Sequence, residues 1–127
     1  MSRILVVDDE EPIRSLVARA LAQDGHEIVT ADDGAEALDL ITRRPGGFDL
    51  LVADIRMPVM DGIALALATA RDHPDIIILL MTAYADQRER ASGLDRLIHD
   101  VITKPFTLDA IRAAIAGALA AGAQRAR

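Results

Sequence analysis

Short runs of aliphatic residues alternate along the chain with longer stretches in which apolar residues recur every three or four positions. The short runs predict β-strands at residues 3–8, 26–31, 49–54, 75–81 and 99–103. Several of these runs are apolar throughout, which is typical of strands that helices cover on both faces. Only the run at 26–31 alternates apolar and polar residues, so we expect it at an edge of the sheet, with one face partly in water.

The stretches between the strands carry the start and stop signals of helices. Pro12 lies near the start of the first helix and Gly25 follows its end. Asp33, with Glu36 three residues later, resembles a capping box at the start of the second, and Thr107 is the expected cap of the fifth. The five predicted helices cover about residues 12–24, 33–44, 62–73, 86–95 and 107 onward.

Five successive strand–helix units in 127 residues predict an α/β fold in a single domain. Right-handed crossovers then give a doubly wound (βα)5 three-layer sandwich, with a central five-stranded parallel sheet in the strand order 2-1-3-4-5. In such a sheet ligands bind beyond the carboxyl ends of the strands, near the first and the third. We expect the domain to cover residues 1–121, followed by a short C-terminal tail at 122–127 and no output domain.

The composition limits the kinds of partner. Hydrophobic residues make up 51% of the chain and aromatic residues 2%, so we expect a core of aliphatic side chains and alanine. The formal net charge of -6 argues against nucleic-acid binding and against a polybasic membrane anchor. The sequence has no cysteine, no leader pattern before its first strand and no apolar run that could span a bilayer, so we expect a cytoplasmic protein.

Polar residues of complementary chemistry close four of the predicted strands. Asp8 and Asp9 follow the first strand, and Asp54 ends the third. Thr82 follows the fourth, and Lys104, the chain's single lysine, follows the fifth. Because the carboxyl ends of parallel strands meet at one edge of a sheet, we expect these five side chains to lie together.

Such a cluster suits a metal ion and a phosphoryl group. At an effective dielectric constant of about 20, two carboxylates about 4 Å apart repel by roughly 4 kcal/mol, and protonation or a divalent cation relieves this repulsion. Mg²⁺ prefers oxygen ligands and keeps positions open for water or phosphate. Asp54 can then act as a nucleophile and become an acyl phosphate. Lys104 would neutralise one phosphoryl oxygen, and Thr82 would donate a hydrogen bond to another.

Each of these residues also has a plain structural explanation. An aspartate at the end of a strand commonly caps a helix or a turn, a threonine there commonly forms a turn, and a lone lysine is commonly a solvated surface amine. Asp8 and Asp9 would also favour the positive end of the first helix. The matching chemistry of four separate strand ends favours the functional interpretation.

The motifs around these residues resemble those of the response-regulator receiver domain, the CheY-like phosphoacceptor module of two-component signalling. The resemblance runs from Ile4 to about Leu119 and implies a flavodoxin-like or CheY-like sheet. Its motifs are Val-Val-Asp-Asp-Glu at 6–10, Asp-Ile-Arg-Met-Pro-Val-Met-Asp-Gly at 54–62, Met-Thr-Ala at 81–83 and Lys-Pro-Phe at 104–106.

The resemblance implies a role for each matching residue. A phosphohistidine on a partner protein would phosphorylate Asp54, while Thr82 and Lys104 would contact the phosphoryl group. It also implies a cis peptide bond between Lys104 and Pro105, an isomer that proline makes accessible. The implied ligands of Mg²⁺ are Asp8 (through water), Asp9, Asp54 and the backbone carbonyl of Arg56.

The chain departs from the family pattern around residue 101. Receiver domains commonly carry an aromatic residue three positions before the lysine, which moves inward as the threonine moves toward phosphate; this chain has Val101 there. Residues 97–100 replace the usual small-residue turn, and Tyr84, the only tyrosine, either gates the site or lies at its rim. The expected switch and partner face comprises Ala83, Tyr84, His99, Val101, Pro105 and Phe106.

Residues 84–90 and 94–100 look like those of the CpdR type of single-domain regulator, which acts as an adaptor for the ClpXP protease when unphosphorylated. On this interpretation the chain is a stand-alone response regulator. Its partners would be a histidine kinase or histidine phosphotransfer protein and a downstream protein such as the unfoldase ClpX. A homodimer through the face of the fourth helix, fifth strand and fifth helix is a further expectation.

Other functions fit parts of the same pattern. A phosphoryl shuttle would pass the group from Asp54 to another histidine. A small Mg²⁺-dependent aspartyl phosphatase is less favoured, because such hydrolases supply an acid two residues after the nucleophile and this chain has Arg56 there. A dimerisation module that has lost its chemistry is disfavoured, because every acidic and cationic position is intact. We therefore expect a phosphoacceptor that catalyses only its own phosphorylation and dephosphorylation, rather than an enzyme.

Overall fold

Five parallel strands form one sheet in the order β2-β1-β3-β4-β5. The structure is a computed structural model that describes residues 2–125, except for the side chains of residues 85, 86 and 123–125. The strands are β1 (Arg3–Val7), β2 (Glu27–Ala31), β3 (Leu50–Asp54), β4 (Ile77–Thr82) and β5 (Asp100–Thr103). The predicted fold class and strand order are confirmed, and every strand begins and ends within two residues of its predicted bounds.

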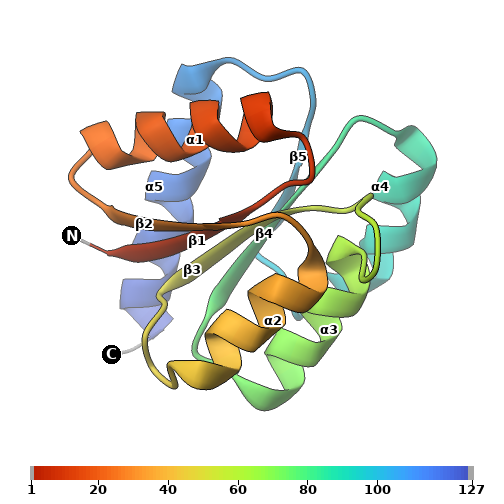
Figure 1. Ribbon diagram of the computed structural model, residues 1–127, viewed down its shortest axis with the longest axis horizontal. Helices are drawn as coiled ribbons and strands as arrows, with labels where there is room; N and C mark the ends of the chain where they lie inside the picture. The colour runs from red at the N-terminus through yellow and green to blue at the C-terminus, as the bar shows by residue number, and fades with distance from the viewer. Residues whose placement is uncertain (1, 126–127) are drawn as a thin grey trace.

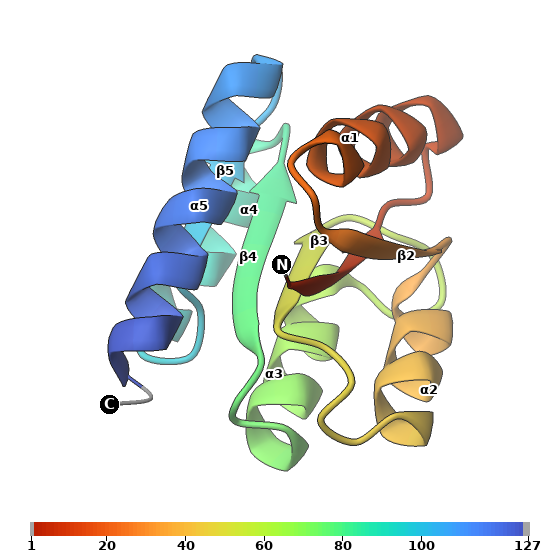
Figure 2. The same cartoon turned by 90° about the vertical axis from the view of Figure 1, so that its left-hand side faces the viewer.

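Helices cover both faces of this sheet and complete three layers (Figures 1 and 2). One face packs against α1 (Glu11–Gln23) and α5 (Leu108–Arg125). The other packs against α2 (Gly34–Arg43), α3 (Gly62–Asp72) and α4 (Ala85–Ala91). No helix in the described part of the chain is long and apolar enough to cross a membrane.

Alternate residues of the central strands supply the two halves of the core. In β1, Leu5 and Val7 belong to the cluster under α2 and α3, whereas Ile4 and Val6 belong to the cluster under α1 and α5. All four are fully buried. This two-sided burial explains why the central strands are apolar throughout, while the edge strand β2 exposes Glu27 and Thr30 as its alternating pattern predicted.

Side-chain caps fix the starts of three helices, two of them at the predicted cap residues. The carboxylate of Asp33 accepts a hydrogen bond from the backbone N–H of Glu36 (2.9 Å), and the hydroxyl of Thr107 accepts one from Ala110 (3.0 Å). Asp61 caps α3 in the same way, through the N–H of Ala64. The capping box is only partly as predicted, because the Glu36 carboxylate accepts from the N–H of Asp32, one residue before the cap.

The fourth helix is shorter than predicted. The helix expected over 86–95 ends at Ala91 and continues as a 3-10 turn, η1 (Ser92–Leu94). Its sequence is polar and contains Gly93, and Ala91 is the only buried residue among the described side chains of α4. The last helix, α5, extends to Arg125, four residues beyond the expected end of the domain; residues 126 and 127 lie outside the described residues.

Thr69 offers a test of the packing under α3. Its side chain is fully buried, and its hydroxyl has no hydrogen-bond partner among the described residues. An unpaired buried hydroxyl costs roughly 1–3 kcal/mol. We therefore expect Thr69→Val, which keeps the side-chain shape, to raise the free energy of unfolding by about 1 kcal/mol in urea denaturation. The same change at the exposed Thr42 of α2 is the control and should have almost no effect; a destabilised Thr69→Val would show that the hydroxyl is satisfied.

Candidate functional site

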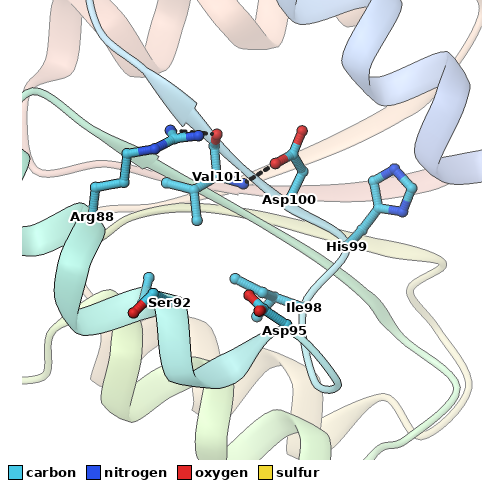
Figure 3. A pocket seen from close by; sticks show the side chains of 8 residues that line it. Arg88, Ser92, Asp95, Ile98, His99, Asp100 and Val101 are labelled. Carbon is cyan, nitrogen blue, oxygen red and sulfur yellow. Dashed lines mark hydrogen bonds between the residues drawn. The ribbon is translucent and has the colours of Figure 1, made fainter.

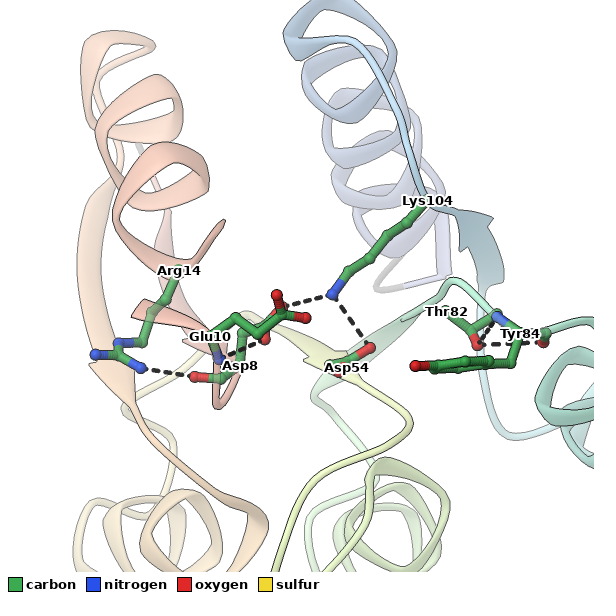
Figure 4. Close-up of polar contacts among 7 residues, drawn as sticks. All are labelled: Asp8, Glu10, Arg14, Asp54, Thr82, Tyr84 and Lys104. Carbon is green, nitrogen blue, oxygen red and sulfur yellow. Dashed lines mark hydrogen bonds and ion pairs between the residues drawn. The ribbon is translucent and has the colours of Figure 1, made fainter. Parts of the chain in front are cut away.

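The carboxyl ends of four strands meet at one edge of the sheet and carry the predicted polar residues (Figure 4). Asp8 follows β1, and Asp54 ends β3 opposite Met81 of β4. Thr82 ends β4, and its backbone carbonyl accepts a hydrogen bond from the N–H of Lys104 (2.7 Å). The register of the parallel ladder therefore brings these residues together from positions up to 96 residues apart in the chain.

The ammonium group of Lys104 lies between two buried carboxylates. Its Nζ is 2.8 Å from Asp8 Oδ2 and 3.3 Å from Asp54 Oδ1. Asp8 is fully buried, and the side chains of Lys104 and Asp54 are 9% and 8% exposed. The attraction between these charges counteracts part of the cost of their desolvation, and removing one member would leave an uncompensated buried charge.

Burial makes the charged form of Asp54 unfavourable. Desolvation raises the pKa of its carboxyl to about 6; the positive charge of Lys104 opposes this rise, and the negative charge of Asp8 adds to it. Desolvation would lower the pKa of Lys104, but its hydrogen bond to Asp8 and the charge of Asp54 outweigh that effect and raise it. Lys104 is therefore a cation at neutral pH, while Asp54 is an anion under electrostatic strain.

Backbone contacts and one arginine hold the loop that carries Asp8. The other carboxylate oxygen of Asp8 accepts a hydrogen bond from the N–H of Glu10 (3.0 Å). The guanidinium of Arg14 donates to the backbone carbonyl of Asp8 (2.7 Å) and pairs with Asp32 at 3.3 Å. Arg14, in the first turns of α1, thus helps to position Asp8. The sequence indicates this role only by placing a cation near an acidic motif.

Three acidic residues at the end of β1 fit a divalent cation. Asp8, Asp9 and Glu10 can each present one carboxylate oxygen so that all three lie within 4.8 Å of one another. These hard oxygen donors, one of them fully buried, match the preference of Mg²⁺. Sequence reasoning named Asp9 and Asp8 but missed Glu10, although it stands in the same motif. Asp54 is outside this group of three and is joined to Asp8 through Lys104.

The hydroxyl of Thr82 is bound to the start of α4. It accepts a hydrogen bond from the N–H of Tyr84 (3.1 Å) and donates to the carbonyl of the same residue (3.3 Å). Tyr84 is 47% exposed, and the guanidinium of Arg56 lies 4.8 Å from the centre of its ring. Tyr84 and Arg56 thus form a cation–π pair beside Thr82 and Asp54, at the rim of the site.

The loop after Asp54 brings the start of α3 into close contact with the backbone of Asp54. A Cβ on Gly62 would lie 2.3 Å from the backbone oxygen of Asp54, so a side chain there would push α3 away from the site. In the same loop, Val59 has a φ of 70° and is 84% exposed. A β-branched residue rarely adopts this conformation, and such strain is commonly found beside functional residues.

The residues expected to form the switch face lie at both ends of β5: Ala83, Tyr84, Pro105 and Phe106 follow the carboxyl ends of β4 and β5, whereas His99 precedes β5 at the opposite edge of the sheet. The Lys104–Pro105 peptide bond is cis, as the family pattern implied. Ala83, Tyr84, His99 and Pro105 are exposed, whereas Val101 and Phe106 are half-buried against the two core clusters. A cavity of about 330 Å³ between α4, η1 and β5 is lined by His99 and Val101, and also by Arg88, which sequence reasoning did not single out. The switch role of these residues stays a prediction.

The comparisons with known proteins agree with this geometry. The family described as the response regulator receiver domain matches residues 4–116. Among solved structures, a CheY-like receiver domain protein from Methanospirillum hungatei shares 26% identity, with a TM-score of 0.90 and 98% of each chain covered. The response regulator TrrA from Thermotoga maritima, solved in complex with Mg²⁺ and BeF, shares 34% identity, with a TM-score of 0.82, 92% of this chain and 98% of TrrA covered.

The curated relatives are longer proteins. The response regulator MprA of Mycobacterium leprae is 39% identical over 114 residues, which is 89% of this chain but 49% of MprA. MprA of Mycobacterium avium is 40% identical over 112 residues, or 87% of this chain and 48% of the relative. The chain therefore spans about half the length of the curated relatives that it matches.

The raised pKa of Asp54 predicts a characteristic dependence of stability on pH. A carboxyl whose pKa rises from 3.8 to about 6 on folding favours the folded state below about pH 4, and this contribution is lost as the pH rises through 6. Relative to wild type, Asp54→Asn should therefore become more stable between pH 4 and 7, by about 3 kcal/mol at most. Chemical denaturation in a chelating buffer at several pH values measures this difference.

A matched control removes a carboxylate elsewhere. Asp75→Asn lies in the exposed turn before β4 and should follow the wild-type profile. Mg²⁺ should raise the stability of wild type at pH 7 more than that of Asp54→Asn, because a cation relieves the repulsion among the carboxylates. If the difference in unfolding free energy between Asp54→Asn and wild type were constant across this pH range, the pKa of Asp54 would not be raised on folding.

Proposed function

The chain belongs to the response regulator receiver domain family, and we propose that it accepts a phosphoryl group from a partner's phosphohistidine on the carboxylate of Asp54. Receiver domains are phosphoacceptors in two-component signalling and bind Mg²⁺ at an acidic cluster, so a histidine kinase is the partner that the family implies. The position of Lys104 Nζ between Asp8 and Asp54, at 2.8 and 3.3 Å, is the observation that carries the assignment to Asp54.

The neighbours of Asp54 match the needs of the reaction. One carboxylate oxygen would attack the phosphorus while the bond between phosphorus and the histidine nitrogen breaks. The ammonium group of Lys104 would then move from the Asp54 carboxylate toward a phosphoryl oxygen and neutralise its charge. It would do so because a phosphoryl group on Asp54 carries more negative charge than the carboxylate. Thr82, at the end of the adjacent strand, has a hydroxyl that can donate to another of these oxygens.

The acidic residues supply the site for the cation. We assign Asp9, Asp8 and Asp54 with the carbonyl of Arg56 as the ligands of Mg²⁺, and the gathering of Asp8, Asp9 and Glu10 makes Glu10 a further ligand candidate. When bound, Mg²⁺ neutralises charge on the transferring oxygens. Burial makes ionisation of the Asp54 carboxyl unfavourable. A cation nearby would favour the ionised form, which is the form that attacks phosphorus.

The alternative assignments make less use of this geometry. A phosphatase would need an acid or base two residues after Asp54, and Arg56 is instead held against the ring of Tyr84. A phosphoryl shuttle uses the same residues as the proposed phosphoacceptor and differs only in a second histidine partner. We therefore keep the shuttle as a variant of the proposed function, to be separated from it by a transfer assay with purified partners.

Labelling with a small phosphoryl donor tests the assignment directly. Acetyl phosphate with Mg²⁺ should add one phosphoryl group to the protein, seen by intact mass spectrometry and by loss of the label in alkaline hydroxylamine. Asp54→Asn should abolish labelling, and a chelator should suppress it in wild type. Asp75→Asn, in an exposed turn, should label like wild type; undiminished labelling of Asp54→Asn would mean that the acceptor is another residue.

The narrower resemblance, to CpdR-type adaptors, concerns the output. It rests on residues 84–100, and the relatives described above carry other names. We propose on that resemblance that the unphosphorylated chain binds the unfoldase ClpX and that phosphorylation releases it. If so, a pull-down with purified ClpX should retain wild type and Asp54→Asn, and beryllofluoride with Mg²⁺ should release wild type only. Absence of ClpX binding by the unmodified protein would reject this output while leaving the phosphoacceptor assignment intact.

A further inference from the structure

Arg88 joins α4 to the edge strand β5. Its Nη1 donates hydrogen bonds to the backbone carbonyl of Val101 (2.9 Å) and to the hydroxyl of Thr103 (2.9 Å). Figure 3 shows the guanidinium of Arg88, one of the residues that line the cavity, reaching from α4 to Val101. The side chain of Arg88 therefore connects α4 to two residues of β5 that lie 13 and 15 positions later in the sequence.

Side chains satisfy both backbone groups of Val101. Its N–H donates to the carboxylate of Asp100 (2.8 Å), and its carbonyl accepts from Arg88. β5 is the last strand of the sheet and, within residues 2–125, pairs with β4 alone. The contact with Arg88 thus covers part of an open strand edge, which would otherwise offer unpaired backbone groups to water or to another protein.

The described side chains of α4 contribute little apolar packing. Among the described side chains of α4, only Ala91 is buried. Val101 is half-buried and does not fill the cavity of about 330 Å³ beneath Arg88. The position of α4 therefore depends strongly on polar contacts, those of Arg88 with β5 and of Arg90 with Asp61 (3.0 Å). An element with few buried apolar contacts moves at low cost in free energy.

A continuous series of hydrogen bonds leads from the site to Arg88. The hydroxyl of Thr82 binds the N–H and the carbonyl of Tyr84, and that carbonyl accepts the backbone N–H of Arg88 (3.1 Å). A hydroxyl has a single proton to donate. If Thr82 donates it to a phosphoryl oxygen on Asp54, its bond to the Tyr84 carbonyl is lost, and the first turn of α4 loses one of the two hydrogen bonds that tie it to the end of β4.

We propose that Arg88 is a strap that reports the phosphorylation state of Asp54 to the edge of β5. The inference rests on the proposed function and adds its route of regulation. In the unphosphorylated state the strap holds α4 against β5 and covers the carbonyl of Val101. Phosphorylation of Asp54 draws the Thr82 hydroxyl away from Tyr84, α4 shifts, and Arg88 releases Val101 and Thr103. The arginine takes the place that packing of a large side chain at residue 101 would otherwise have.

NMR of the full chain with and without beryllofluoride and Mg²⁺ tests the strap. The amide signals of Thr82 and Lys104 report occupation of the site, and those from Val101 to Thr103 report the strap. In wild type, both sets should shift. In Arg88→Ala, the site signals should shift as in wild type, whereas the β5 signals should start displaced toward their occupied-state positions and lose most of their further shift.

Arg90→Ala is the matched control, since it removes an arginine from the same helix whose contact is with Asp61 of α3. Both sets of signals should shift in it as in wild type. Thr103→Val keeps Arg88 but removes one of its two acceptors, and it should reduce the β5 shift, which gives a second test if Arg88→Ala folds poorly.

The two sets of signals separate the possible failures. If beryllofluoride leaves Thr82 and Lys104 of wild type unchanged, the proposed function itself fails. If those signals shift while Val101 to Thr103 stay unchanged in wild type, the strap is wrong. The same conclusion holds if Arg88→Ala retains the full β5 shift.

Discussion

The ammonium of Lys104, between the buried carboxylates of Asp8 and Asp54, governs the chemistry of the strand ends. Two carboxylates and one ammonium leave the cluster with one net negative charge in a region that excludes water. At an effective dielectric constant of about 20, each contact of about 3 Å is worth roughly 5 kcal/mol in Coulomb energy, before the desolvation of the charges is subtracted. Such a cluster is stable enough to form, yet it favours the arrival of a further cation.

This balance also explains why the site can respond to phosphorylation. A phosphoryl group on Asp54 adds negative charge next to Lys104 and presents oxygens to Thr82. New hydrogen bonds to these oxygens would therefore compete with the present hydrogen bonds of Lys104 and Thr82. Most of the fold cannot follow, because the central strands and the inner faces of α1, α2, α3 and α5 belong to two densely packed clusters. The segment that can follow is α4, since polar contacts rather than a buried face hold it. A rigid sheet with one loosely packed helix thus converts a local change of charge into a change of surface.

Much of the fold could be predicted because its signals are local. Continuous aliphatic runs marked the central strands, an alternating run marked the edge strand β2, and Asp33 and Thr107 marked helix starts. The grouping of the polar strand ends was predictable because parallel strands place their carboxyl ends at one edge of the sheet. The proximity of Asp54 and Lys104 could therefore be predicted from the strand order. The extent of α4 was harder, because a polar helix gives weak boundary signals.

The amino-acid sequence alone determined the strand order, the residues at the strand ends and the family to which they point, because periodicity, capping and short motifs are properties of neighbouring positions. Only the tertiary structure decided which of these groups touch. Lys104 could have pointed to solvent, but it pairs with Asp8 from 96 residues away. Arg88 could have been one of several surface arginines, but it binds the edge of β5. Such contacts depend on the packing of helices against a sheet and on the reach of long side chains, and no pattern of adjacent residues records either.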